Sequence, residues 1–456
     1  MAHPMLSTRK GNGIPVHVVS GEKEMTGSKS IPADALRWAR ASGYRARKGE
    51  LCLVPGKEGI AGAIFSMGAK NATLEIGRLP RLLPKGEWKL EGFKGDLELA
   101  TLAWLLGAYR FDRYRIAKPS EARLVLPDGV DGAFVQAQAE AVYITRDLIN
   151  LPTNDLGPAE LEQAIRDLGG RFKAKVTATR GDALLTRRFP MVHAVGRASA
   201  SEPRIVDLRW GKAEHPKVTL VGKGVCFDSG GLNIKPGDSM ALMKKDMGGA
   251  AHVLGLASMI MSARLPVRLR VIVPAVENSI SANAFRPGDI LQSRKGLTVE
   301  IGNTDAEGRL ILGDALAWAD EESPELLIDM ATLTGAARVA LGPDLPAIFT
   351  DDDSLAADLQ KAGGQSSDPM WRLPLWQGYK AGLSSQVADL SHIGKGPMAG
   401  SITAALFLQH FVEKAQAWVH FDVYAWTASE KPSCPIGGEA QAIRAIYQVL
   451  KARYAR

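Results

Sequence analysis

The stretch from Val221 to Ala251, VGKGVCFDSGGLNIKPGDSMALMKKDMGGAA, carries the strongest structural signal in this sequence. Its first residues complete an apolar strand, a glycine-rich polar loop follows, and Gly248 begins a helix of small residues that can pack closely against a sheet. Lys223 and Asp228 come after the strand, so we expect both on a loop at its C-terminal end, where ligands bind in open α/β sheets. Taken alone, Asp246 before this helix is more often an N-cap than a ligand.

A second segment, Gly302–Leu310 (GNTDAEGRL), adds two acids, and an extended backbone would point Asp305 and Glu307 the same way. Together with Asp228 and Asp246 of the first segment they make four carboxylates, which repel one another unless they are neutralised. Two divalent cations would supply the compensating charge, and Mn²⁺, Mg²⁺ and Zn²⁺ all accept oxygen-rich sites of this kind. Lys235 and Arg309 would then remain for a developing oxyanion or a bound anion.

Apolar strands alternate with helices along most of the chain after residue 150. The expected strands are residues 218–221, 269–276, 298–301, 326–331 and 417–423. The expected helices begin at Pro158 and cover 248–263, 307–319 and 402–412. Residues 1–95 give a weaker pattern with short strands at 14–19 and 50–54, followed by a helix at 97–109 and a strand at 123–126. This alternation is typical of an α/β fold with a layered sheet.

The length of 456 residues predicts two or three domains. The alanine- and glutamine-rich stretch 133–151 predicts a long helix that ends at Pro152, because proline cannot continue it, and Pro158 begins the next helix. We therefore expect an N-terminal α/β domain in residues 1–130, a linker helix in 131–152, and a larger α/β domain in 153–456 that carries the acidic segments.

Composition excludes several classes of protein. Hydrophobic residues make up 46% and charged residues 23% of the chain, as in ordinary globular proteins, so the chain is neither disordered nor fibrous. The net charge is +7, and residues 1–140 carry +6 of it, with 21 Lys and Arg against 15 Asp and Glu. This basic first third leaves nucleic-acid binding, which would weaken steeply with salt, as an alternative that no run of five like charges supports.

The three cysteines, Cys52, Cys226 and Cys434, lie far apart, which indicates a reducing compartment rather than a disulfide framework. The first residues lack the apolar region of a signal peptide, and no apolar stretch approaches ~20 residues, so we expect a cytoplasmic protein without a membrane segment. Cys226 is expected to be a small buried residue rather than a nucleophile, and His420 a structural histidine within a strand.

Motifs of several other enzyme classes are missing from the sequence. It contains no GxSxG, HExxH or GxxxxGK[ST] motif and no GxGxxG after a strand, so serine hydrolases, zincins, NTPases and Rossmann enzymes lack support. A dinuclear phosphoesterase would need the same pair of metals, although such sites usually bring several histidines and the acidic segments contain none. A relative that has lost its activity is a further alternative.

The motifs VGKGVCFDSGGLNIKP (221–236), MKKDMGGAA (243–251) and NTDAEGRL (303–310) closely resemble the signatures of the cytosol (leucyl) aminopeptidases, which are dinuclear metal exopeptidases. The resemblance extends to ATLTGA at 331–336 and GSITAALF at 400–407, and it covers about residues 140–430. It implies a smaller N-terminal α/β (macro-like) domain and a larger C-terminal α/β catalytic domain with a mixed central sheet flanked by helices. It also implies a homohexamer that acts on peptides with a free N-terminus.

By position, the resemblance assigns a role to each motif residue. The ligands of the tightly held metal would be Lys223, Asp228, Asp246 and Glu307. The ligands of the readily exchanged metal would be Asp228, Asp305 and Glu307, so that Asp228 and Glu307 bridge the two ions. The two catalytic cations would be Lys235 and Arg309. The substrate site would be lined by Met243, Asn303, Thr332, Leu333 and Gly335.

The resemblance also implies a mechanism, the metal-assisted removal of N-terminal amino acids, leucine-like ones and others. One metal would hold the free α-amine, a bridging water or hydroxide would attack the scissile carbonyl, and Lys235 would stabilise the gem-diolate. A bicarbonate held by Arg309 would serve as the base. The ions would be Mn²⁺ or Zn²⁺, with Mg²⁺ as a third candidate. As a metal ligand Lys223 must be a neutral amine, and lowering its pKa from ~10.4 to ~7 costs about 4–5 kcal/mol, which only a close dication and burial can supply.

Overall fold

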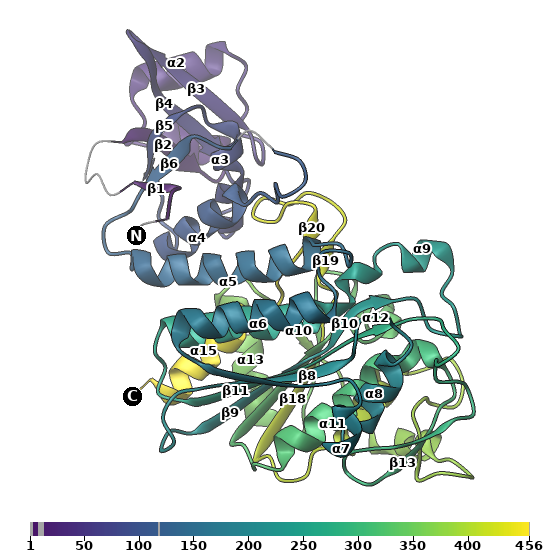
Figure 1. Ribbon diagram of the computed structural model, residues 1–456. Helices are drawn as coiled ribbons and strands as arrows, with labels where there is room; N and C mark the ends of the chain where they lie inside the picture. The colour runs from purple at the N-terminus through teal and green to yellow at the C-terminus, as the bar shows by residue number, and fades with distance from the viewer. Residues whose placement is uncertain (1–2, 8–12, 117–118, 456) are drawn as a thin grey trace. The chain divides into compact units, whose positions relative to one another are not determined.

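The computed structural model describes residues 3–7, 13–116 and 119–455 (Figure 1). The chain divides into two compact units: Met1–Tyr143 with Thr427–Ile436, and Ile144–Trp426 with Gly437–Arg456. Helix α5 (Gly132–Asn150) contains the point at which the chain passes from the first unit to the second. The division into residues 1–130, 131–152 and 153–456 stays a proposal of ours. No helix of the described residues is long and apolar enough to cross a membrane.

The described residues of the first unit form a six-stranded sheet with the order β1-β6-β5-β2-β4-β3. Its strands are β1 (Leu6–Ser7), β2 (Ile14–Val19), β3 (Leu51–Gly56), β4 (Gly59–Ser66), β5 (Gly86–Glu91) and β6 (Ala122–Val125). Neighbouring strands are parallel except β3, which is antiparallel to β4. The helices are α1 (Glu22–Gly27), α2 (Ala33–Ala41), η1 (Thr73–Arg78), α3 (Leu79–Leu82) and α4 (Leu97–Ala108). Trp88 and Trp104 are among the side chains that fill its core.

The second unit contains a nine-stranded mixed sheet in its described part, with the order β16-β15-β18-β14-β9-β11-β8-β7 and with β10 also paired to β11. Its strands are β7 (Lys175–Arg180), β8 (Arg204–Trp210), β9 (Lys217–Gly222), β10 (Gly224–Asp228), β11 (Arg268–Asn278), β14 (Leu326–Ala331), β15 (Ala347–Phe349), β16 (Trp371–Arg372) and β18 (Ala417–Asp422). Strands β18, β14, β9 and β11 run parallel, whereas β15, β8 and β7 pair antiparallel. The predicted mixed central sheet is therefore confirmed.

Helices cover both faces of this sheet, as Figure 1 shows for α6, α10 and α15 on one face and α7, α8 and α11 on the other. The helices of the second unit are α6 (Pro158–Phe172), α7 (Ala183–Thr186), α8 (Pro190–Gly196), α9 (Gly237–Met240), η2 (Met243–Met247), α10 (Gly248–Ser262), η3 (Thr304–Ala306), α11 (Glu307–Asp320), α12 (Gly335–Leu341), α13 (Asp353–Gln365), η4 (Gln377–Leu383), α14 (Gly400–Gln409) and α15 (Ile443–Tyr454). Short strands complete it: β12 (Ile290–Gln292), β13 (Thr298–Glu300) and β17 (Leu390–Ser391), while β19 (Trp426–Thr427) and β20 (Gly437–Gly438) lie at unit boundaries. One core cluster joins Val221 and Leu327 of the sheet to Leu312 of α11 and Phe407 of α14.

The parallel strands bring distant segments to one edge of the sheet. Because β9, β14 and β18 are parallel neighbours, their carboxyl ends lie together, with Gly222 opposite Met330 and Ala331 opposite Asp422. The residues that follow are Lys223 after β9 and the segment 332–335 after β14. The edge that the sequence predicts as a ligand site is thus assembled by the strand order.

Helix α10 packs against this edge so closely that a side chain at Gly249 has no room. A Cβ atom there would lie 2.0 Å from the carbonyl oxygen of Met330 and 2.8 Å from the backbone nitrogen of Lys223. Met330 lies in β14, and Lys223 directly follows β9. The Lys223 N–H donates to the same Met330 oxygen at 3.0 Å. Close packing is therefore the reason for the small residues that begin this helix.

We expect Gly249→Ala to lower the free energy of unfolding by about 3 kcal/mol or more, because backbone atoms must move to admit one methyl group. Urea unfolding followed by circular dichroism measures this. The matched control is Gly170→Ala in α6, where the glycine is exposed and an added Cβ meets nothing within 4 Å. That variant is expected to gain about 0.5–1 kcal/mol of helix stability. Equal effects of the two substitutions would contradict the packing argument.

Candidate metal centre

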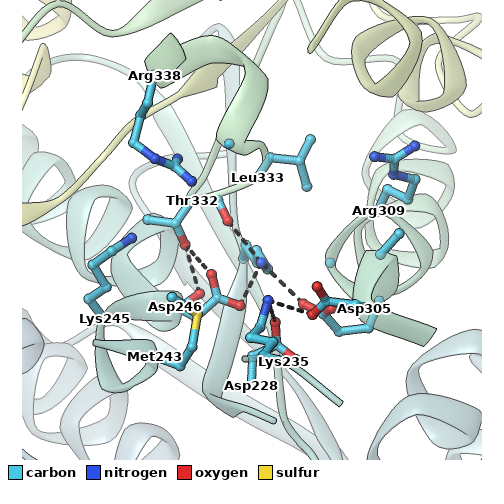
Figure 2. Close-up of a pocket in the computed structure, with 15 residues that line it drawn as sticks. Asp228, Lys235, Met243, Lys245, Asp246, Asp305, Arg309, Thr332, Leu333 and Arg338 are labelled. Atoms are coloured by element: carbon cyan, nitrogen blue, oxygen red, sulfur yellow. Dashed lines mark hydrogen bonds and ion pairs between the residues drawn. The ribbon is translucent and has the colours of Figure 1, made fainter. Parts of the chain in front are cut away.

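A pocket of about 140 Å³ opens at the carboxyl edge of the sheet (Figure 2). Eleven of the twelve residues to which the sequence assigns a site role line it: Lys223, Asp228, Lys235, Met243, Asp246, Asp305, Glu307, Arg309, Thr332, Leu333 and Gly335. The remaining residue, Asn303, is not in the lining. Its side-chain oxygen instead accepts a hydrogen bond at 2.8 Å from the backbone N–H of Asp305. Four lining residues were not predicted: Lys245, Ala306, Gly308 and Arg338.

Three of the carboxylates converge on one point. Asp228, Asp305 and Glu307 each offer an oxygen atom, and these atoms lie within 4.8 Å of one another. Asp228 and Glu307 are almost fully buried, with 2% and 1% of their surface exposed. Oδ1 of Asp228 accepts hydrogen bonds from Asn278 Nδ2 at 2.8 Å and from the Gly230 N–H at 2.9 Å, which fixes the direction of this carboxylate.

The local structure around the acids differs from the sequence expectation in two respects. Asp228 does not lie on a loop but is the last residue of β10, a strand that pairs with β11. Asp305 and Glu307 are not on extended backbone, because Asp305 lies in the 3₁₀ turn η3 and Glu307 is the first residue of α11. The 3₁₀ turn, and not the alternation of side chains along an extended strand, therefore directs both carboxylates into the pocket.

Asp246 occupies the other side of the pocket, on the 3₁₀ turn η2. Its Oδ1 accepts a hydrogen bond from the Thr332 hydroxyl at 2.8 Å, and its Oδ2 accepts one from Lys223 Nζ at 2.6 Å. The cap position of α10 belongs to Met247, which makes no side-chain cap bond. Asp246 is therefore a pocket residue and not the N-cap that its position before a helix suggests.

Two lysine ammonium groups lie between the carboxylates. Lys223 Nζ is 2.6 Å from Asp246 and 3.2 Å from Glu307, and it also donates to the Thr332 carbonyl oxygen at 2.8 Å. Lys235 Nζ is 2.9 Å from Asp228 and forms a second ion pair with Asp305 (Figure 2). The acids and the lysines thus form one continuous charged cluster.

A glycine pair places Lys235 in this cluster. Gly230 and Gly231 have φ values of +85° and +63°, which side chains rarely permit. A Cβ atom on Gly230 would also lie 2.4 Å from the carbonyl oxygen of Asn233. The turn closes with a hydrogen bond from the Lys235 N–H to the Ser229 oxygen at 2.9 Å, which returns the lysine to the carboxylates.

The pKa values of the cluster reflect burial opposed by charge. Burial lowers the pKa of Lys223, but the attraction of Asp246, Glu307 and Asp228 outweighs it, so this pKa is raised above its usual value. For Lys235 burial is likewise outweighed, here first by Asp228, and its pKa is also raised. Burial and the charge of Asp228 raise the pKa of Glu307. The carboxylates attract cations strongly and resist being ionised together.

The donor set fits divalent metal ions. Four carboxylates and one amine are the oxygen and nitrogen ligands that Mn²⁺, Mg²⁺ and Zn²⁺ accept. Glu307 Oε1 is buried and makes no hydrogen bond to any described residue, although Lys223 Nζ lies 3.2 Å away. A buried carboxylate oxygen without a hydrogen bond is unfavourable, and a metal ion would satisfy it. The geometry therefore supports metal binding at this cluster.

Arg309 lies across the pocket on the first turn of α11. One Nη donates to the His392 carbonyl oxygen at 2.7 Å, whereas Nε is buried and has no hydrogen-bond acceptor among the described residues. Burial lowers the pKa of Arg309 to about 10, opposed first by the charge of Glu307, so the guanidinium stays charged at neutral pH. A buried cation with a spare N–H is suited to hold a small anion.

Lys245 and Arg338 are the charged lining residues that the sequence did not single out. Lys245 has 3% of its surface exposed, and burial followed by the nearby charge of Arg338 lowers its pKa to about 7. Two sequence signals point to them in retrospect. Lys245 stands directly before Asp246, and Arg338 lies one helical turn after Gly335, so both sit beside expected site residues.

Two residues outside the pocket behave as buried structural groups. Cys226 is 1% exposed, and burial raises its pKa, which disfavours the thiolate that a nucleophile needs. His420 lies in β18, where its Nδ1 is 2.6 Å from Asp329 Oδ1. No histidine lines the pocket in the described part of the chain, which weakens the phosphoesterase alternative.

Another buried histidine, His252 of α10, gives the fold a pH dependence. Its Nδ1–H donates to Gly248 O at 2.6 Å and its Nε2 accepts from the Gln441 N–H at 2.9 Å, an arrangement that only the neutral ring can make. Burial lowers its pKa from 6.5 to about 4. Between these values the unfolded chain binds a proton that the folded chain does not, so stability falls as the pH falls through this window.

We expect this group to remove up to about 3 kcal/mol of stability between pH 6.5 and pH 4, at 1.36 kcal/mol per unit. Urea midpoints at pH 7, 6, 5 and 4 measure the decline. In His252→Gln the decline should be smaller by the contribution of one group, whatever the variant's stability at pH 7. An identical slope in both proteins would show that His252 does not titrate in this range.

The comparisons with known proteins agree with this geometry. A sequence profile described as "Cytosol aminopeptidase family, catalytic domain" matches residues 143–447, and one described as "M17 aminopeptidase, N-terminal domain" matches residues 14–127. A protein named probable cytosol aminopeptidase from Syntrophotalea carbinolica is 42% identical over 400 residues, which are 84% of this chain and 78% of that protein. A protein of the same name from Roseiflexus castenholzii is 42% identical over 365 residues, 76% of this chain and 74% of its own length.

Solved structures show the same fold. The cytosol aminopeptidase from Coxiella burnetii superposes with a TM-score of 0.94 at 47% identity, covering 98% of this chain and 99% of its own. The bottromycin maturation enzyme BotP, in complex with Mn, superposes with a TM-score of 0.86 at 31% identity, covering 96% of this chain and 99% of its own. Profile, relatives and fold lead to one conclusion: this chain belongs to the cytosol aminopeptidase family, a family of metal-dependent peptide hydrolases.

Proposed function

We propose that this chain removes N-terminal amino acids, leucine-like ones and others, from peptides, with two divalent metal ions bound in the pocket of Figure 2. The observation that carries the proposal is the convergence of Asp228, Asp305 and Glu307, whose oxygen atoms lie within 4.8 Å of one another beside two lysines. The ions are Mn²⁺ or Zn²⁺, with Mg²⁺ as a third candidate.

The ligands follow the resemblance and the contacts. We propose that the ligands of the tightly held ion are Lys223, Asp228, Asp246 and Glu307. The ligands of the exchangeable ion are then Asp228, Asp305 and Glu307. Lys223 must lose a proton to act as a ligand, and its carboxylate partners hold that proton firmly. Metal and proton therefore compete for one amine, so binding should release a proton and weaken as the pH falls.

The chain's own residues complete the chemistry. Bound divalent ions would polarise the scissile carbonyl and lower the pKa of a water molecule. Lys235 is held by Asp228 and Asp305 with its ammonium facing the pocket, where it can donate to an oxyanion as the carbonyl is attacked. Arg309 would hold a bicarbonate, which would supply a general base beside the bound water. Met243, Thr332, Leu333 and Gly335 line the space for the N-terminal residue, and we place Asn303 as a support of the Asp305 turn.

Arg309→Ala is expected to lower kcat by about 10²-fold, the usual contribution of a positioned base, and added bicarbonate should partly restore it. The measurement is leucyl-p-nitroanilide hydrolysis in carbon dioxide-free buffer, with and without bicarbonate. Arg286→Ala, at an arginine whose side chain is 59% exposed, is the matched control. Full activity of Arg309→Ala without bicarbonate would exclude the role of Arg309.

A substrate panel tests the proposed function as a whole. Metal-stripped protein is reloaded with Mn²⁺, Zn²⁺ or Mg²⁺ and offered leucyl-p-nitroanilide, peptides with free or acetylated N-termini, and p-nitrophenyl phosphate. We expect cleavage only of substrates with a free α-amine. Hydrolysis of the phosphate ester alone would favour the phosphoesterase, and cleavage of none would contradict the proposal.

The assembly and location also follow from the resemblance. We propose a homohexamer of 48.9 kDa chains in the cytoplasm, in keeping with the relatives named cytosol aminopeptidases. Multi-angle light scattering of the purified protein measures the mass directly, and a monomer would contradict the hexamer.

A further inference from the structure

Two basic side chains of the pocket have no part in the chemistry described above. Lys245 lies on η2 between Met243 and Asp246, and Arg338 lies on α12. Figure 2 shows both on the side of the pocket that carries Met243 and Asp246, with Arg309 on the opposite side. They therefore belong to a wall of the pocket that is separate from the arginine proposed to hold bicarbonate.

Both cations pack over one aromatic ring. Lys245 Nζ is 4.7 Å and Arg338 Cζ is 5.0 Å from the centre of the Tyr424 ring. A Cβ atom added to Gly335 would lie 3.7 Å from an Nη of Arg338, so the guanidinium also borders the segment expected to line the substrate site. Lys245, Arg338 and Tyr424 thus form a compact group, which we call the basic wall.

The basic wall has no anionic partner. Within the described residues neither cation makes an ion pair or a hydrogen bond to a carboxylate, and the two acids nearby are engaged elsewhere. Asp246 is paired with Lys223 at 2.6 Å. Asp422 accepts hydrogen bonds from the backbone N–H groups of Leu333 and Thr334, each at 3.1 Å. It also accepts one from the Thr334 hydroxyl.

Lys245 is buried and Arg338 is half-buried. A buried cation without an anion is unfavourable, and a second cation close by repels it. Contacts with an aromatic ring offset only part of this cost. The guanidinium of Arg338 presents several N–H donors in a planar fork, and the Lys245 amine can donate hydrogen bonds towards the pocket. Such an arrangement is stabilised when an anionic group of a ligand enters the pocket.

We propose that the basic wall recognises the side-chain carboxylate of an N-terminal aspartate or glutamate of the substrate. The inference rests on the proposed function, which holds the α-amine of that residue at the carboxylate cluster. The side chain of the same residue then lies within a few ångströms of the amine, beside Met243 and the basic wall. The chain accordingly prefers acidic N-terminal residues over their neutral amides.

The test compares substrates that differ by one charge. We expect kcat/KM for α-glutamyl-p-nitroanilide to exceed that for glutaminyl-p-nitroanilide at least about tenfold, the usual effect of a charged hydrogen bond. Lys245→Met and Arg338→Met should each reduce this ratio. Lys244→Met is the control, because Lys244 donates to the Asn150 carbonyl oxygen and does not line the pocket, so its ratio should match the wild type. Calorimetry should show tighter binding of L-glutamate than of L-glutamine to the metal-loaded protein.

The outcomes separate the alternatives. A wild-type ratio of one or less, or an equal ratio in all variants, would overturn this inference. Cleavage of leucyl substrates by the same preparations would show that the aminopeptidase activity itself is intact. The same variants are tested on leucylglycine and leucylglycinamide, which differ in the C-terminal carboxylate. A change confined to that pair would assign the basic wall to the far end of a dipeptide and overturn our assignment. Cleavage of no substrate at all would overturn the proposed function and this inference with it.

Discussion

Glu307→Gln is expected to abolish metal binding and to lower kcat/KM by at least about 10³-fold. The substitution keeps the shape of the side chain but removes one of the converging negative charges and one proposed bridging ligand. Glu307 is 1% exposed and its Oε1 makes no hydrogen bond to any residue that the structure describes, so little besides charge is lost. Isothermal titration with Mn²⁺ and hydrolysis of leucyl-p-nitroanilide measure the two effects.

This variant should also fold, and that separates a loss of metal from a loss of structure. Burial and the charge of Asp228 raise the pKa of Glu307, so a neutral side chain relieves repulsion in the metal-free protein. We expect its metal-free stability to equal or exceed that of the wild type. Asp238→Asn, at an exposed acid of α9 outside the pocket, is the matched control and should bind metal normally. Tight Mn²⁺ binding by Glu307→Gln would contradict the ligand assignment.

Lys235→Met is expected to lower kcat by about 10²–10³-fold, the usual cost of removing one donor to a developing oxyanion. The ammonium of Lys235 is 2.9 Å from Asp228 and pairs with Asp305, so it faces the space between the proposed ligands of the exchangeable ion. Methionine keeps most of the length of the side chain and removes the charge. The binding of substrate in its ground state should change far less than kcat.

A role of Lys235 in holding the acids apart predicts a different result. In that case metal affinity would change and kcat at saturating metal would recover. We therefore measure Mn²⁺ affinity and kcat at saturating Mn²⁺ in the same preparation. Lys235→Arg keeps the charge with a different geometry and should retain more activity than Lys235→Met. Wild-type kcat in Lys235→Met at saturating metal would exclude its catalytic role.

Much of the second unit could be predicted because its strands are continuous apolar runs. Residues 326–331 were expected as a strand and form β14 with the same bounds, and all six are buried. The strand 14–19 of the first unit is also found unchanged as β2. Helices α1 and α2 were missed because they span only six and nine residues, although the buried Ala35 and Ala39 of α2 stand at helical spacing. The assignment of Thr427–Ile436 to the first unit depends on long-range contacts that no local pattern contains.

The site could be predicted where its residues stand in motifs, and the rest depended on tertiary structure. The direction of Asp305 follows from a 3₁₀ turn that the Asn303 cap stabilises, whereas the sequence suggested extended backbone. The sequence around Lys245 does not predict that its side chain is buried. The fold covers it with Tyr424, which lies 179 residues later in the sequence and has its ring centre 4.7 Å from Lys245 Nζ.

The most direct test of the account is a titration of the metal-stripped protein with Mn²⁺, in which bound metal and leucyl-p-nitroanilide hydrolysis are recorded together. The account predicts no activity without metal, two ions bound per chain at saturation, and activity that rises as the sites fill. Glu307→Gln should show neither binding nor activity under the same conditions. Full hydrolysis by the metal-free wild-type protein, or saturation of activity with no ion bound at the carboxylate cluster, would contradict it.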